Sequence, residues 1–86
     1  MKYKIVFTKQ AEKDLKKVAA SPLKSKVVRL LNVLEDDPMQ PPYEKLIDLD
    51  ENYSRRINLQ HRLVYQVYED EGTIKIIRMW THYGDN

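Results

Sequence analysis

The stretch Tyr53–Val67, YSRRINLQHRLVYQV, decides the fold that this sequence predicts. Side chains alternate between two faces in both of its halves, and a period of two is typical of β-strands. The halves predict strands over Tyr53–Leu59 and Arg62–Tyr68, joined by a tight connection at Gln60-His61 in which His61 is a turn residue. The centre of the chain is therefore expected to form a β-hairpin.

Arginines are unusually frequent in this predicted hairpin. Arg56 and Arg62 fall on the polar side of their strands, whereas Arg55 shares a side with Tyr53 and Ile57. A charged side chain on a half-buried strand is costly unless it is paired. A guanidinium binds a phosphate through two parallel hydrogen bonds, so the hairpin predicts an anion-binding surface.

The sequence around the hairpin predicts two helices and three further strands. Apolar residues recur at helical spacing over 11–19 and 27–34, with Thr8 and Ser21 as the N-caps and Pro38 beyond the second helix. Strands are expected at Tyr3–Phe7, Glu44–Leu49 and Thr73–His82. The order β-α-α-β-β-β-β predicts an α+β fold, an antiparallel sheet with the N-terminal helical pair packed on one side.

Length and composition predict a small soluble protein. The 86 residues are expected to form one domain over 1–86, with a thin core. The chain contains no cysteine, no signal-peptide pattern and no apolar run long enough to cross a membrane. We therefore expect a cytoplasmic protein without membrane contact.

The formal net charge of +2 conceals a segregation of charge along the chain. Residues 1–30 contain nine Lys and Arg against two acids, whereas residues 31–52 contain seven acids against one lysine. Clustered lysines indicate a basic face that attracts polyanions such as nucleic acids. A solvated helix surface has the same pattern, so both interpretations stay open.

The sequence also contains candidates for metal-free RNA cleavage, which needs a base, a cation and an acid. Glu44 is the candidate base, and Arg56 and Arg62 are the candidate cations. His82 is the candidate acid, since an imidazole with a pKa of about 6.5 transfers protons at neutral pH. Tyr83 offers a flat ring on which an RNA base can stack.

Each of these residues also has a purely structural interpretation. Glu44, His82 and Tyr83 would then be a solvated acid, an edge-strand histidine and a packing ring. The two polar-side arginines would pair with the acids Asp48, Asp50 or Glu51. Two histidines without cysteine do not make a metal-ligand set, so we expect neither a metal nor another cofactor.

The order of these motifs resembles the YoeB/Txe branch of the RelE-like toxins of bacterial toxin–antitoxin modules. In that family a Glu precedes an S-R-R-I strand, an H-R-L-V-Y strand and a terminal His-Tyr. The corresponding residues here are Glu44, Ser54–Ile57, His61–Tyr65 and His82-Tyr83. The resemblance covers nearly the whole chain and implies a RelE-like fold.

The resemblance implies that the protein enters the ribosomal A site and cleaves mRNA there. Carried over by motif, Glu44 would be the general base, Arg62 would stabilise the transition state and His82 would be the general acid. No cofactor is implied.

Binding roles follow from the same resemblance. Arg55, Arg56 and Tyr83 would contact RNA or its phosphates. The implied partners are a YefM-like antitoxin, the 70S ribosome with its mRNA, and operator DNA through the antitoxin complex alone.

Two features depart from the family pattern. Gly84-Asp85-Asn86 follows the His-Tyr pair, and Asp85 places negative charge close to the proposed site. The family often has a Lys a few residues after its Glu, whereas here Lys45 directly follows Glu44. Neighbouring strand residues point to opposite faces, so we do not include Lys45 in the site.

Two alternative functions remain open at this point. A ParE-like toxin shares the fold but inhibits DNA gyrase, and that branch generally lacks the Glu/Arg/His/Tyr set. An inactive RelE-like subunit would serve only in partner binding or co-repression.

Overall fold

The computed structural model describes residues 2–45, 52–58 and 61–80 of the chain. Within them the elements follow the predicted order, with a short 3₁₀ helix before the last strand. Their bounds are β1 Lys4–Phe7, α1 Lys9–Ala19, α2 Lys24–Asp36, β2 Glu44–Lys45, β3 Asn52–Arg56, β4 Arg62–Tyr68, η1 Glu69–Glu71 and β5 Thr73–Arg78.

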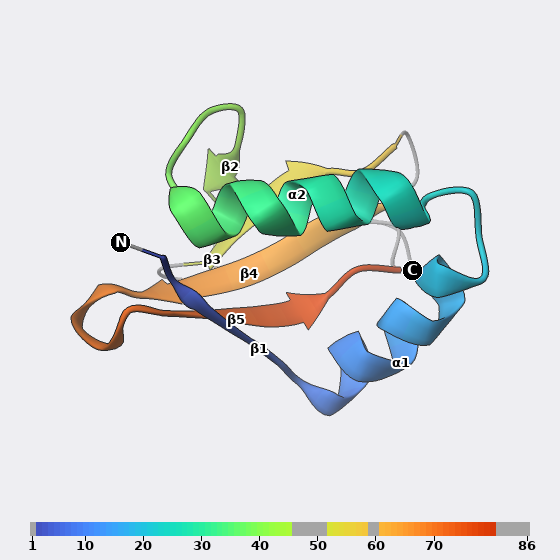
Figure 1. Cartoon of the computed structure of the whole chain (residues 1–86), viewed down its shortest axis with the longest axis horizontal. Helices are drawn as coiled ribbons and strands as arrows, with labels where there is room; N and C mark the ends of the chain where they lie inside the picture. The colour runs from blue at the N-terminus through green and yellow to red at the C-terminus, as the bar shows by residue number, and fades with distance from the viewer. Residues whose placement is uncertain (1, 46–51, 59–60, 81–86) are drawn as a thin grey trace.

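The five strands form one sheet in the order β1-β5-β4-β3-β2. α2 lies lengthwise across one face of the sheet, and α1 lies near the end where β1 leads into it (Figure 1). Strands β2 to β5 pair antiparallel, whereas β1 pairs parallel with β5. The α+β class is confirmed, and the expectation of a wholly antiparallel sheet is wrong at this edge.

The parallel edge is possible because the chain follows a long path between β1 and β5. Parallel pairing requires a crossover connection, and both helices and three strands separate β1 from β5. Thr8 fixes the junction: its N–H donates to Ile76 O at 3.1 Å and its hydroxyl donates to Ile77 O at 2.8 Å. The same hydroxyl accepts from Ala11 N at 3.0 Å, so the predicted N-cap of α1 is confirmed.

The predicted cap of the second helix is wrong. α2 begins at Lys24, and Ser21 instead forms a tight turn after α1. The Ser21 hydroxyl donates to Val18 O at 2.9 Å and accepts from Leu23 N at 3.1 Å. Because that hydroxyl already closes the turn, the helix starts three residues later.

The core lies between the helices and one face of the sheet. β4 contributes alternate residues to it, Leu63, Tyr65 and Val67, as the period of two predicts. The other fully buried apolar residues include Ala11, Val18, Val27, Leu34, Ile57, Ile74, Ile76 and Met79. Burial of each large apolar side chain stabilises the fold by about 1.5–3 kcal/mol.

Two predicted strands end earlier than expected. β3 ends at Arg56 because the N–H groups of Ile57 and Asn58 both donate to His61 O, at 2.9 and 3.2 Å. β5 ends at Arg78. No described segment forms a helix with the length and apolarity that crossing a bilayer requires.

Candidate active site

The register of the sheet brings the predicted polar residues together on the face turned away from α2, here called the outer face. Residues paired across neighbouring strands point to the same face. Glu44 pairs with Ser54, Ser54 with Val64, and Val64 with Arg78, which makes one row across four strands. Arg56 and Arg62 pair with each other in the next row.

The centre of the outer face is an ion pair between Arg62 and Glu44. Nη1 of Arg62 donates to Oε1 of Glu44, and the same nitrogen lies 3.5 Å from the Ser54 hydroxyl. The side chain of Arg62 is 21% exposed and that of Glu44 is 62% exposed. Arg62 thus reaches across β3 to the edge strand β2, and both charged groups remain accessible to a ligand.

Arg56 adds a second cation beside this pair. Its side chain is exposed and makes no ion pair or hydrogen bond with the described part of the chain. The acids that the sequence offers as its partners, Asp48, Asp50 and Glu51, lie outside the described residues. Two guanidinium groups in directly opposed positions repel each other, so an anion bound between them would be stabilised.

A groove of about 350 Å³ adjoins the ion pair. Its walls come from α2, the loop before β2, and strands β2, β3 and β4. The lining residues are Leu30, Pro42, Tyr43, Glu44, Ser54, Arg55, Arg56 and Arg62. The groove therefore combines apolar and aromatic surface with the charged groups of the outer face.

Arg55 has a different environment from Arg56 and Arg62. It is 3% exposed, and its guanidinium donates to the carbonyls of Pro38, Gln40 and Pro42 and to the Tyr65 hydroxyl. These bonds use all three guanidinium nitrogens to hold the proline loop that leads into β2. The expected role of Arg55 in phosphate binding does not fit this placement, because its donors point to the protein.

Tyr65 completes the attachment of the proline loop. Its hydroxyl donates to Pro38 O at 2.9 Å and accepts from Nε of Arg55 at 3.2 Å. Burial raises the pKa of the Tyr65 hydroxyl above its ordinary value, while the neighbouring Arg55 charge opposes that rise. The neutral phenol is therefore the form that fits the core.

Asp14 is a buried residue that the sequence analysis missed. It is 1% exposed, and its Oδ2 accepts from the backbone N–H groups of Met79 and Trp80 at 2.9 and 3.2 Å. Its Oδ1 accepts from Gln10 at 2.9 Å. The sequence contains a signal for this burial, because Asp14 lies three residues after Ala11 and therefore falls on the apolar face of α1.

Asp14 holds the chain directly ahead of the proposed His82 and Tyr83, which themselves lie outside the described residues. Two residues before His82, the indole of Trp80 stacks on His61, with ring centroids 4.3 Å apart and an angle of 18°. His61 lies at the turn between β3 and β4, as expected, and is also buried. This stack joins the hairpin turn to the end of β5.

The expected site residues that the structure describes divide into two groups. Glu44, Arg56 and Arg62 lie together on the outer face. Arg55 lies on the core side, and Lys45 pairs with Tyr53 of that same side, so Lys45 stays outside the group. Among the residues that the structure covers, no three His, Asp or Glu side chains form a metal site.

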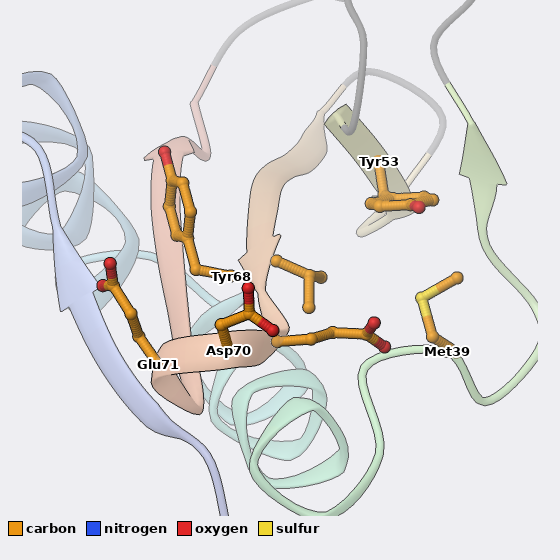
Figure 2. A pocket seen from close by; sticks show the side chains of 7 residues that line it. Met39, Tyr53, Tyr68, Asp70 and Glu71 are labelled. Atoms are coloured by element: carbon orange, nitrogen blue, oxygen red, sulfur yellow. The ribbon is translucent and has the colours of Figure 1, made fainter.

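A second hollow, of about 450 Å³, lies at the other end of the sheet. Figure 2 shows Asp70 and Glu71 at its rim beside Tyr68, with Tyr53 and Met39 across from them. Glu69 also lines it. Three carboxylates repel a polyanion, so this hollow does not suit RNA.

Comparisons with known proteins agree with this fold. A model of the ParE toxin of the type II toxin–antitoxin system parDE matches residues 5–85. No curated protein sequence matches the chain. Among solved structures, the YoeB/ParE toxin from Agrobacterium tumefaciens is 26% identical with a TM-score of 0.85, covering 93% of this chain and 99% of that one.

Two further structures extend the comparison. The YoeB dimer from Staphylococcus aureus is 34% identical with a TM-score of 0.82, covering 96% of this chain and 100% of that one. An archaeal RelE–RelB complex from Pyrococcus horikoshii OT3, at 22% identity and a TM-score of 0.75, covers 95% of this chain and 97% of that one and confirms the RelE-like fold. The chain thus belongs to the ParE toxin family of type II toxin–antitoxin systems, as a YoeB-type member of the RelE/ParE superfamily.

Proposed function

We propose that this toxin is a ribosome-dependent endonuclease that cleaves mRNA in the A site and thereby inhibits translation. The observation that carries the proposal is the Glu44–Arg62 ion pair on the outer face, with Arg56 in the next row. A carboxylate and two guanidinium groups in one accessible cluster supply a base and the cations that a phosphate requires.

In the proposed reaction, Glu44 takes the proton of the ribose 2′-OH, and the 2′ oxygen forms a bond to phosphorus. Arg62 stabilises the additional negative charge of the phosphorane, and Arg56 binds a phosphate oxygen. The bond from phosphorus to the 5′ oxygen then breaks, and His82 protonates that oxygen. The products are a 2′,3′-cyclic phosphate and a free 5′-OH, so no water is consumed.

The proposed partners are those of the YoeB-type toxins. In Staphylococcus aureus the related toxin forms a YoeB–YefM complex, and we extend a YefM-like antitoxin to this protein. Tyr83 would position the nucleotides, and operator DNA would be bound only through the antitoxin complex. The exposed lysines of α1 would face ribosomal RNA, in the cytoplasm.

A second candidate is inhibition of DNA gyrase, which the match to the ParE model favours. The accessible Glu44–Arg62 pair and Arg56 have no evident use in that function. This difference makes the two functions separable by a direct activity test.

The test is primer extension on a defined message, with purified toxin added to ribosomes stalled on it and to the same message alone. A cut in the A-site codon, seen only with ribosomes and lost in Glu44→Ala, Arg62→Ala and His82→Ala, supports the endonuclease. If growth arrest persists without any cut and supercoiling by gyrase is inhibited, the second candidate replaces it. Circular dichroism of each variant shows that the fold is retained.

A further inference from the structure

We propose that the groove beside the Glu44–Arg62 pair binds one nucleobase of the mRNA, and that Tyr43 is the ring on which this base stacks. The inference rests on the proposed endonuclease function and adds a specificity-determining residue outside the Glu/Arg/His/Tyr set. Its first support is the lining, which joins Leu30, Pro42 and Tyr43 to Arg56 and Arg62.

This combination suits a single nucleotide of unpaired RNA. Such sites join cations, which hold the backbone, to aromatic rings, on which bases stack. The volume of about 350 Å³ lies at the small end of the range for ligand pockets. Arg56 and Arg62 line the same groove as Leu30, Pro42 and the Tyr43 ring, a combination that favours an anionic occupant with a flat apolar part.

The position of Tyr43 matches the geometry of a nucleotide. Tyr43 directly precedes Glu44, which lies on the outer face. Its ring contacts Tyr53, on the core side, so the ring and the carboxylate lie on opposite sides of the sheet edge. Tyr43 and Glu44 both line the groove. A bound nucleotide would therefore have its sugar and phosphate at the ion pair and its base at the Tyr43 ring.

The ring of Tyr43 is held in place before any ligand arrives. It meets Tyr53 edge to face, with centroids 5.6 Å apart and planes at 82°. The Arg55 guanidinium lies 5.9 Å from the ring centroid and also binds Pro42 O, on the preceding residue. A fixed ring loses little conformational entropy on binding, so stacking contributes more of its free energy to affinity.

The hollow at the other end of the sheet provides the contrast. It also contains a tyrosine, the exposed Tyr68, but Glu69, Asp70 and Glu71 line the same hollow. Aromatic surface therefore lines both hollows, and of these two the one at Tyr43 also has cations among its described lining residues. Tyr68 is the matched control for a substitution of Tyr43.

The experiment measures cleavage on stalled ribosomes that carry each of the four bases, in turn, at each A-site codon position. The variants are Tyr43→Phe, Tyr43→Leu and Tyr68→Leu; Leu keeps apolar bulk at position 43 but removes the flat ring. We expect Tyr43→Phe and Tyr68→Leu to remain within about twofold of the wild type. Tyr43→Leu should lower kcat/KM by about 5- to 150-fold, mainly through KM, and flatten the base preference at one codon position.

A binding measurement separates this inference from the proposed function. Fluorescence anisotropy is recorded with a 2′-deoxy oligonucleotide, which cannot be cleaved, and with versions that lack one base. Removing that base from the oligonucleotide and substituting Tyr43→Leu in the protein should weaken binding by the same factor. The two losses of affinity should not add when both changes are combined. Additive losses, equal losses in Tyr43→Leu and Tyr68→Leu, or an unchanged base preference overturn the inference. A wild type that binds in this way but does not cut overturns the proposed function alone.

Discussion

Arg56 and Arg62 face each other directly across β3 and β4, and Arg62 alone of the two pairs with Glu44. Like charges in opposed strand positions are destabilising. The ion pair neutralises one of them in the free protein, and a bound phosphate would act on both. We therefore expect Glu44 to weaken RNA binding, by competing with phosphate for Arg62, and to be required for cleavage. A substitution that removes only its charge separates these two effects.

Glu44→Gln should strengthen RNA binding while it abolishes cleavage. The amide keeps the shape of the side chain but removes the charge that competes with phosphate for Arg62. We expect tighter binding of a 2′-deoxy oligonucleotide, a steeper dependence of affinity on salt, and a loss of cleavage of at least about 100-fold. Glu69→Gln, at the far end of the sheet, is the control for net charge. Weaker binding by Glu44→Gln contradicts the competition.

Arg56→Ala and Arg62→Ala should differ in kind. In the proposed reaction Arg62, which pairs with the general base Glu44, stabilises the transition state, so its loss should lower kcat by about 100- to 1,000-fold. Arg56 is proposed to bind phosphate already in the ground state, so its loss should act mainly on affinity and reduce the salt slope by about one. Single-turnover rates over a range of salt concentrations measure both. Equal changes in kcat for the two variants would contradict this assignment.

Arg55→Ala should destabilise the fold, unlike Arg56→Ala. Its removal leaves the carbonyls of the proline loop without their donor, which lowers the free energy of unfolding by about 1–3 kcal/mol. The exposed Arg56 should change it by less than about 0.5 kcal/mol. Urea unfolding followed by tryptophan fluorescence measures both values. A stable Arg55→Ala variant with weakened RNA binding would restore Arg55 to the phosphate site.

Asp14→Ala should release the end of β5. The backbone N–H groups of Met79 and Trp80 lose their acceptor, so their hydrogen exchange should become faster than that of the Ile74 amide in β5. The free energy of unfolding should fall by about 1–3 kcal/mol. Exchange followed by NMR tests the first expectation, with Glu12→Ala on the exposed side of α1 as the control. Unchanged protection of the two amides would remove Asp14 from this role.

Stability should fall in alkaline solution through Tyr65. Its pKa is raised above 10.0 in the folded protein, so the unfolded chain releases this proton first as pH rises. The contribution to stability is therefore complete below pH 10 and is lost as pH rises through the folded pKa. Thermal unfolding between pH 8 and 11 should show a smaller decline in Tyr65→Phe than in the wild type. The exposed Tyr68→Phe variant should decline as the wild type does.

The sequence alone was sufficient for much of the local structure, though not for the start of α2 or the ends of β3 and β5. The period of two in β4 predicted which residues enter the core, and Thr8 predicted the start of α1. Alternation also placed Arg56 and Arg62 on one side of the hairpin and Arg55 on the other. These features depend on the geometry of a few consecutive residues, which the order of side chains specifies directly.

Only the tertiary structure decided which distant groups meet. It paired Arg62 with Glu44 across an intervening strand, joined Asp14 to the backbone of Met79 and Trp80, and turned Arg55 toward the proline loop. It also set β1 parallel to β5 and placed Tyr43 beside the cations. Such contacts depend on the order of strands in the sheet and on how loops pack, because no local periodicity records which remote segment becomes a neighbour.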